Sequence, residues 1–451
     1  MSAAIESGRL PQAAPVLPLL AHADPKRVLV RRGNRSITVA AFLAEVHALA
    51  ARLPCGRYAV NLCTDRYRFL VAFCAVAVAG QINLLPPSRA PQAVVEVMHD
   101  YPDSYALCDT ALDHSPPRLF LMPDVAAPPH AAGVPDIPAD RIIAIGFTSG
   151  STGRPGANPK TWGSFCTTSA LNAAQICPGS NASSIVATVP PQHMYGLETS
   201  VLLPLRGDAA IHAGQPFFPA DVGQALAEMP APRVLVTTPV HLRALMREAP
   251  TLPALEAIVS ATAPLDTTLA ALAETRYATQ VIELFGSTET CVIAHRRTAH
   301  ESNWQLYSGV NLYPQPDGTL VEAAHFDAPV RLQDIVEVLP SRRFLLRGRN
   351  ADLLEIAGKR ASLGELTRRL LAIPGVDDGV VFQLEINRNG IRRLAALAVA
   401  PTLSEAQIRD ALRQAIDPVF LPRPLRRVAS LPRNATGKLP RDALLAAIRA
   451  G

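Results

Sequence analysis

Long apolar segments, cysteine motifs and a leader-like N-terminus are all missing from this sequence of 451 residues. Its longest apolar run, Phe69 to Gly80, has 12 residues, whereas a membrane-spanning helix needs about 18 or more, so we predict a buried helix there. The seven cysteines are odd in number and include no Cys-x-x-Cys pair, which argues against a disulfide framework and a zinc knuckle. The N-terminus has an acidic residue, Glu6, and no apolar core with a cleavage site, so we expect a protein of the reducing cytoplasm.

Aromatic residues are also scarce, at 5% of the chain. The arginine clusters lack interleaved aromatic residues that could stack on bases, so the sequence does not favour nucleic acid as a partner. Charged residues make up only 18%, but their distribution is uneven: residues 349–451 carry a net charge of +7 and the preceding residues a net charge of −2. The basic C-terminal segment is either an ordinary solvated surface or a docking face for an acidic or phosphorylated partner.

Apolar runs that alternate with helical periods predict an α/β protein of two domains. A helical period covers residues 40–53, and an apolar run at 58–63 precedes the buried helix. Strand-length runs bounded by Pro, Gly or helical sequence lie at 141–146, 185–189, 234–238, 255–260 and 281–285. We therefore predict a large layered α/β domain over residues 1–348, with an irregular connection at the Pro- and His-rich residues 114–139. The change of charge, with shorter elements at 379–384, 395–399 and 404–416, predicts a small α+β domain over residues 349–451.

The segment FTSGSTGRPGANPKTW, residues 147–162, directly follows one of these predicted strands. Gly150 and Gly153 let backbone N–H groups approach phosphate oxygens closely. Further hydroxyl donors are Thr148, Ser149, Ser151 and Thr152. The segment is not a Walker loop, because that motif needs Gly-Lys-Ser/Thr and here Lys160 follows Pro159. A flexible Ser/Gly turn is the alternative for this segment considered alone.

The order Thr-Ser-Gly-Ser-Thr-Gly-x-Pro with a lysine beyond it resembles the phosphate loop of the adenylate-forming superfamily, which includes acyl- and aryl-CoA synthetases, carrier-protein ligases, adenylation domains and luciferases. In the family pattern lysine directly follows proline, whereas residues 156–159 intervene here. Other segments resemble family motifs in the same order: PPQHMYG at 190–196, SATAPL at 260–265, FGSTE at 285–289, Asp334, Gly348-Arg349, GKR at 358–360 with Glu365, and PRNATGK at 432–438. The resemblance covers nearly the whole chain, and it implies a large N-terminal domain and a small, mobile C-terminal one.

The resemblance implies ATP and Mg²⁺ as cofactors, and a reaction in which a carboxylate attacks the α-phosphate. Such a reaction depends on charge neutralisation and positioning. Thr288 would donate to the α-phosphate and Glu289 would bind Mg²⁺; a helix N-cap is the alternative for this pair. The nucleotide would also contact Thr148, Ser149, Gly150, Ser151, Thr152, Gly153, Lys160, Ala261, Thr262, Phe285, Gly286, Asp334 and Arg349. The acid pocket would be bordered by His193, Tyr195, Gly196 and Thr262. Core packing for the pocket residues and Phe285, and a surface charge for Asp334 and Arg349, are the alternatives.

Lysine is rare, with four residues against 39 arginines. Three of the four, Lys160, Lys359 and Lys438, fall inside the motifs above. A compact ammonium fits between a carboxylate and a phosphate where a planar guanidinium would not. We therefore predict that Lys438 is the catalytic lysine; a terminal-loop lysine without a function is the alternative.

The resemblance also implies a second step, in which the C-terminal domain rotates and a thiol attacks the acyl-adenylate. The hinge would be Ala351 or Asp352, and Gly358, Lys359 and Arg360 would face the thiol tunnel. The net charge of +7 suits either coenzyme A or the phosphopantetheine arm of an acidic acyl carrier protein.

A looser resemblance concerns the substrate. The compact length, the segment PQHMYGLE and the extended loop that ends at Trp162 are similar to short ligases of aryl-polyene and xanthomonadin-type pigment pathways, which load a hydroxybenzoate such as 3-hydroxybenzoate onto an acyl carrier protein. We therefore predict an aryl-acid:acyl-carrier-protein ligase. The alternatives are a ligase that uses free coenzyme A, a non-catalytic nucleotide-binding regulator and a luciferase-like oxygenase.

Overall fold

The computed structural model describes residues 15–86, 88–123, 133–148, 156–177, 182–349, 353–356, 359–384, 393–434 and 437–450. The chain separates into two compact units, residues 1–300 (unit 1) and 301–451 (unit 2). The domain boundary predicted between residues 348 and 349 falls inside unit 2 and stays a prediction. Within the described ranges, every helix is too short or too polar to span a lipid bilayer.

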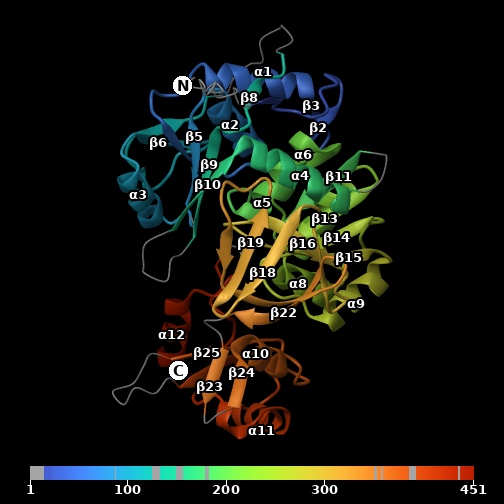
Figure 1. Ribbon diagram of the computed structural model, residues 1–451. Coiled ribbons are helices and arrows are strands. Elements are labelled where there is room, and N and C mark those ends of the chain that lie inside the picture. Colours follow the sequence, from blue (N-terminus) through green and yellow to red (C-terminus); the bar gives the residue numbers. More distant parts are fainter. Residues whose placement is uncertain are drawn as a thin grey trace, which may run out of the picture. The chain divides into compact units, whose positions relative to one another are not determined.

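A six-stranded sheet forms one layer of unit 1. Its order is β10 (Gly156–Thr161), β9 (Ile142–Thr148), β5 (Ile82–Leu85), β4 (Tyr58–Asn61), β6 (Ser104–Cys108) and β7 (Leu119–Leu121). Strands β9, β5, β4, β6 and β7 run parallel, and β10 is antiparallel to β9. Helix α2 (Arg66–Val78) contacts β4 and β5, and α1 (Val39–Ala50) packs on α2 (Figure 1). Helix α3 (Pro91–Asp100) buries Val94 and Val97 in the same apolar core as Leu84 of the sheet.

Helix α2 confirms the buried helix expected from the longest apolar run. Asp65 caps it by accepting a hydrogen bond from the Arg68 N–H (2.9 Å), which satisfies one of the unpaired donors at a helix start. Every side chain from Phe69 to Ala77 is buried. Because α2 lies between the sheet and α1, both of its faces are covered, and a helix in such a place is apolar all round.

A second sheet of unit 1 holds the other predicted strands. Its order is β16 (Cys291–Arg296), β15 (Gln280–Ser287), β14 (Ala257–Ser260), β13 (Arg233–Thr237), β11 (Ser183–Ala187), β12 (Ala209–His212), β2 (Val28–Arg32) and β3 (Arg35–Thr38). The six strands between β16 and β3 are parallel. The adjoining helices are α7 (Pro219–Ala227), α8 (Pro239–Glu248) and α9 (Thr267–Tyr277), which share one apolar core with Leu235 and Ile258. Parallel strands with covering helices are the layered α/β arrangement that the sequence predicts.

A second group of helices contacts β11, β12 and β16 of this sheet. It consists of α4 (Trp162–Ile176), α5 (Met194–Leu197), the π-helix η1 (Glu198–Leu202) and α6 (Leu203–Arg206). Short π-helical turns inside a helix are frequent at functional sites. Here the π-turn places Glu198 directly after the predicted acid-pocket segment.

The irregular connection predicted for residues 114–139 is wrong in its described parts. Strand β7 adds to the edge of the six-stranded sheet, and β8 (Asp136–Pro138) pairs with β1 (Val16–Pro18). Each of these strands has three residues. Three residues are too few to show a period, so pairing with distant segments decides their conformation.

Unit 2 combines small sheets with helices. Strands β17 (Trp304–Leu306), β22 (Arg343–Arg349) and β21 (Asp334–Leu339) are adjacent, and β18 (Val310–Gln315), β19 (Gly318–Ala323) and β20 (Val330–Leu332) form a three-stranded sheet. The later elements are β23 (Leu353–Ile356), β24 (Lys359–Ser362), α10 (Leu363–Leu371), β25 (Asp378–Gln383), β26 (Leu394–Val399), α11 (Glu405–Ala415), η3 (Pro418–Phe420), β27 (Leu425–Arg427) and α12 (Arg441–Ala450). The short elements predicted at 379–384, 395–399 and 404–416 are confirmed as β25, β26 and α11, and Ser404 with Gln407 makes a capping box at the start of α11.

Candidate functional site

The turn between β15 and β16 carries Thr288 and Glu289. The Ser287 and Thr290 hydroxyls lie 3.2 Å apart, and the Thr290 hydroxyl donates to the Cys291 carbonyl (2.8 Å). A Cβ at Gly286 would lie 2.2 Å from that same carbonyl oxygen, so only glycine fits this position. The turn is therefore closed by its own residues, and it leaves Thr288 and Glu289 half-buried.

The end of β9 lies against this turn. A Cβ at Gly146 would be 2.8 Å from Cγ2 of Thr288 and 3.1 Å from Cε of Met194, so the strand approaches both the turn and α5 closely. Thr148 is two residues further along β9 and faces the same side, because side chains alternate along a strand. The chain continues from Thr148 into Ser149, Gly150, Ser151, Thr152 and Gly153, which lie outside the described residues. The strand that leads into the predicted phosphate loop therefore meets the Thr288–Glu289 turn; the phosphate contacts themselves stay a prediction.

Lys160 contacts the same turn from β10. In the antiparallel register Lys160 pairs with Ala144. Its side chain therefore lies on the same face of the sheet as Ala144 and Gly146, which is the face that meets Thr288. Its side chain is buried, with 6% of its surface exposed, and its Nζ donates a hydrogen bond to the main-chain carbonyl of Glu289. The contact between Lys160 and phosphate stays a prediction, and the structure adds this main-chain contact to it.

Glu198 is a residue at this turn that the sequence reasoning missed. It is 1% exposed, and its two carboxylate oxygens accept hydrogen bonds from the Val292 N–H at 3.2 and 3.1 Å. Asn172 of α4 donates to one of these oxygens at 3.1 Å. Burial raises the pKa of Glu198 to about 7, against the effect of these two hydrogen bonds and the charge of Lys160. The sequence carries a signal for it, since Glu198 is the single Asp, Glu, Lys or Arg between residues 189 and 205.

The predicted pocket residues gather at the carboxyl ends of β13 and β14. The Tyr195 hydroxyl lies 3.1 Å from the Thr237 carbonyl and 3.0 Å from the Val259 carbonyl, and burial raises its pKa. Its hydroxyl is thus committed to the main chain and its ring is buried in α5, where Gly196 follows. Thr262 comes just after β14 and has a φ of +79°, a left-handed conformation that non-glycine residues rarely adopt. Such local strain is typical of residues that a functional site holds in place.

Other predicted residues of unit 1 lie beside these. His193 occupies the N-cap position of α5, Ala261 is buried after β14, and Phe285 is half-buried on the neighbouring strand β15. The parallel arrangement therefore brings the segments 190–196, 260–265 and 285–289 together at one edge of the sheet. Open α/β sheets bind their ligands at that edge.

The remaining predicted residues belong to unit 2. Asp334 begins β21, is 7% exposed and stands opposite Arg349 in the register of β22, while the Thr319 hydroxyl donates to the Asp334 carbonyl (2.6 Å). Lys438 is exposed, and its main chain is tied to Asn434 by hydrogen bonds of 2.9 Å. Lys359 and Arg360 lie in β24; their side chains and that of Arg349 are outside the described part of the chain. The same holds for the residues Ala351, Asp352 and Gly358.

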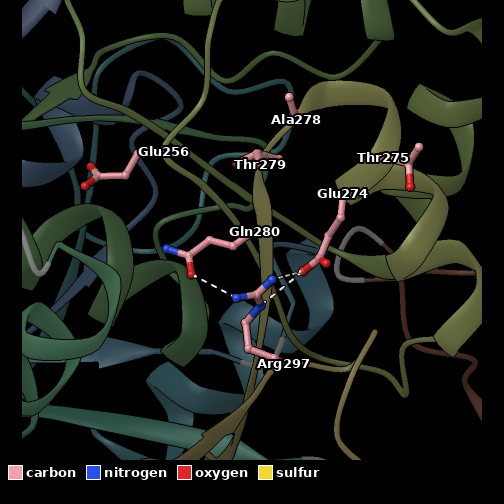
Figure 2. Close-up of a pocket in the computed structure, with 7 residues that line it drawn as sticks. All are labelled: Glu256, Glu274, Thr275, Ala278, Thr279, Gln280 and Arg297. Atoms are coloured by element: carbon pink, nitrogen blue, oxygen red, sulfur yellow. Dashed lines mark hydrogen bonds and ion pairs between the residues drawn. The ribbon is translucent and has the colours of Figure 1, made fainter.

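A wide, open cavity of about 530 Å³ lies elsewhere in unit 1. It is lined by Glu256, Glu274, Thr275, Ala278, Thr279, Gln280 and Arg297 (Figure 2). The Arg297 guanidinium donates to Glu274 at 2.7 and 3.1 Å and to Gln280 at 3.4 Å. Glu256 precedes β14 and Gln280 begins β15, so the cavity lies at the amino ends of these strands. The candidate site is at their carboxyl ends, and the volume of the cavity is therefore not an argument for function there.

Comparison with known proteins agrees with the motifs. The sequence model of the family described as AMP-binding enzyme matches residues 20–316. The 4-coumarate–CoA ligase of Rhodobacter capsulatus is 27% identical over 65% of this chain and 74% of its own length. The isonitrile lipopeptide synthase of Streptomyces coeruleorubidus is 35% identical over 28% of this chain, which spans only 9% of that synthase.

A solved structure shows the same fold. The O-succinylbenzoate coenzyme A synthetase of Bacillus subtilis, in complex with ATP and magnesium ion, superimposes with a TM-score of 0.81 at 17% identity, over 95% of this chain and 99% of that one. The predicted α/β fold of adenylate-forming enzymes is confirmed by this likeness.

Proposed function

This chain belongs to the AMP-binding enzyme family, and from that premise we propose that it is an ATP-dependent acid–thiol ligase that activates an aryl carboxylic acid as its adenylate. The observation that carries the proposal is the contact between the end of β9 and Thr288, together with the hydrogen bond from Lys160 to Glu289. These contacts join the strands that flank the phosphate loop to the turn that would meet the same phosphates. The presence of both Glu289 and Lys438 favours an enzyme over a regulator that only binds nucleotide.

In the first step, an oxygen of the substrate carboxylate forms a bond to the α-phosphorus while the bond to pyrophosphate breaks. Thr288 would donate a hydrogen bond to the α-phosphate, and Lys438 of unit 2 would neutralise charge between the two anions. Glu289 would hold Mg²⁺, a cation that usually takes one or two protein carboxylates and completes its shell with phosphate oxygens and water. Bound there, Mg²⁺ would screen the phosphate charge. Asp334 and Arg349 would bind the ribose, and Phe285 would stack on adenine.

The acid would lie between α5 and the end of β14, beside His193, Tyr195, Gly196 and Thr262. The Tyr195 hydroxyl already bonds to two main-chain carbonyls, so Tyr195 would border the acid with its apolar ring. An apolar ring beside the acid supports an aryl substrate.

In the second step, a thiolate sulfur forms a bond to the acyl carbon, the bond from that carbon to the AMP oxygen breaks, and AMP leaves. The net charge of +7 over residues 349–451 supports an acidic acyl carrier protein as the thiol donor. Ala351 or Asp352 would be the hinge, and Gly358, Lys359 and Arg360 would line the path of the thiol. The 27% identity to a 4-coumarate–CoA ligase supports coenzyme A as the second candidate acceptor.

Two assays on the full chain test the proposal. Pyrophosphate release should depend on an aryl acid, with hydroxybenzoates preferred over medium-chain fatty acids; no release with any acid would refute it and favour a regulator. A competition between coenzyme A and holo carrier protein then identifies the acceptor. A preference for coenzyme A would overturn the carrier-protein assignment and leave the adenylation step intact.

The variant Lys438→Ala tests the catalytic lysine. Adenylate formation should fall by about 100- to 1,000-fold, the usual loss when one charge-stabilising donor is removed, while transfer from a preformed acyl-adenylate should remain near the wild-type rate. Equal losses in the two half-reactions would show that Lys438 has a different role.

A further inference from the structure

We propose that Lys160 and Glu198 act together as positioning residues that fix the Thr288–Glu289 turn from its buried side. Lys160 holds the carbonyl of Glu289, and Glu198 holds the N–H of Val292. The two anchors lie on either side of Thr290 and Cys291, so they fix the part of the chain that returns from the turn into β16. The inference rests on the proposed function, because it assigns to this pair a role in how the site receives MgATP.

The pairing of β15 and β16 leaves room for the Glu198 anchor. Their register is irregular between Phe285 and Gly286, and Val292 stands opposite Gly286. The Val292 N–H donates to the Glu198 carboxylate and therefore does not remain unpaired in the interior. Cys291, the next residue back toward the turn, has a φ of +59°, which a non-glycine residue adopts only where its surroundings hold it.

Both anchors are ionisable side chains, although groups that never carry a charge could also donate to a carbonyl or accept from an N–H. Hydrogen bonds to charged groups are shorter and stronger than neutral ones, and a buried charge needs an opposite charge nearby. The Lys160 ammonium favours the charged form of Glu198, against the burial that raises its pKa. Each charge therefore makes the burial of the other tolerable, and each holds one end of the same short segment.

The origin of the anchors shows what the pair connects. Lys160 comes from β10, which is antiparallel to the strand that leads into the predicted phosphate loop, and Glu198 comes from the π-turn that follows the predicted acid-pocket segment. The pair thus ties the turn with Thr288 and Glu289 to the two segments expected to hold the phosphates and the acid. A displacement of about 1 Å in such a site can reduce a rate about 100-fold, so this connection matters for reaction geometry.

The test compares Lys160→Met, Glu198→Gln and the double variant of both with the wild-type full chain. Calorimetry measures the Kd for MgATP, and kinetics measure the KM values for ATP and for the acid. Lys160→Met should raise the Kd for MgATP at least tenfold and change the KM for the acid less than twofold. The double variant should regain thermal stability, because no unpaired charge remains, yet keep the weak binding of MgATP. If the double variant binds MgATP with the wild-type Kd, the two residues only compensate each other's charge, and the proposal is overturned.

Two controls separate positioning from general loss of stability. Lys26→Met removes an exposed lysine and should change nothing. Glu274→Gln removes a carboxylate at the amino ends of the strands, where it accepts from the Arg297 guanidinium at 2.7 Å. It should lower the Tm while the Kd for MgATP stays within twofold of wild type. If Glu274→Gln weakens MgATP binding as much as Lys160→Met does, the proposal fails.

Hydrogen exchange without nucleotide separates positioning from a direct contact between Lys160 and phosphate. The amides of residues 286–292 should exchange at least tenfold faster in Lys160→Met and in Glu198→Ala, and unchanged exchange in both variants would overturn the proposal. This measurement needs neither substrate nor turnover. A wild-type chain that releases no pyrophosphate with any acid would refute the proposed function, while the exchange result still decides whether the pair fixes the turn.

Discussion

The two ends of the parallel sheet in unit 1 use their carboxylates differently. At the amino ends, Glu274 accepts from the Arg297 guanidinium at 2.7 Å (Figure 2). It also accepts from the His300 side chain at 2.7 Å and from the Val281 N–H at 2.8 Å. Burial alone would raise the pKa of Glu274, but these three hydrogen bonds outweigh it and the pKa is lowered. At the carboxyl ends, Glu198 has no guanidinium partner among the described residues, and burial raises its pKa to about 7.

The contrast separates stability from function. Glu274 accepts hydrogen bonds from two side chains and one main-chain N–H, and the loss of one of these contacts affects the fold near the cavity. Glu198 and Lys160 instead bond to the main chain of one turn. This arrangement costs more free energy of desolvation but fixes the geometry of the turn. We infer that changes at the carboxyl ends reduce the reaction and that changes at the amino ends reduce stability.

The largest expected effect comes from Glu289→Gln, which keeps the shape of the side chain and removes its charge. Loss of the magnesium ligand should reduce pyrophosphate release by about 100- to 1,000-fold, the range for removing one electrostatic contact in a site of this kind. The Tm should remain within about 2 °C, since the side chain is half-buried and the turn is closed by its own residues. Excess Mg²⁺ should restore part of the rate, and full activity at low Mg²⁺ would disprove the assignment of Glu289.

A smaller effect is expected from the protonation of Glu198. Because its folded pKa is raised to about 7, the native state binds more protons than the unfolded state at pH values between the ordinary carboxyl pKa and 7. The free energy of unfolding should therefore decrease as the pH rises from 5 to 8, by on the order of 2 kcal/mol relative to Glu198→Gln. Urea unfolding of both proteins over this range measures the difference. Parallel pH profiles would show that Glu198 is charged throughout and its burial fully compensated.

Much of the fold could be predicted from the sequence, and the reason is physical. The run that became α2 is apolar on all faces, and the strands that carry the motifs are bounded by Gly and Pro, so local pattern and burial agree. The motif segments 190–196, 260–265 and 285–289 could be placed at one edge of a sheet once their strands were known to be parallel.

The same reasoning could not find the anchors of the turn. Lys160 lies 129 residues from Glu289 in the sequence and Glu198 lies 94 residues from Val292, and a main-chain carbonyl or N–H leaves no trace in the residue type. Tyr195 illustrates the same limit, because its predicted place near the acid pocket does not reveal that its hydroxyl bonds to the carbonyls of Thr237 and Val259. Interactions with distant main-chain groups require the fold itself.

The smallest effect should come from Glu274→Gln at the amino ends. The loss of charge weakens its hydrogen bonds to Arg297 and His300, which should reduce the free energy of unfolding by about 1 kcal/mol at pH 7, because Arg297 and His300 are 37% and 61% exposed. The folded pKa of Glu274 is lowered, so the wild-type advantage is present above the ordinary carboxyl pKa near 4.5 and disappears as the pH falls through the folded value. Pyrophosphate release should be unchanged at every pH where the variant is folded. A variant as stable as wild type at pH 7 but slower in the reaction would reverse the roles assigned to the two ends of the sheet.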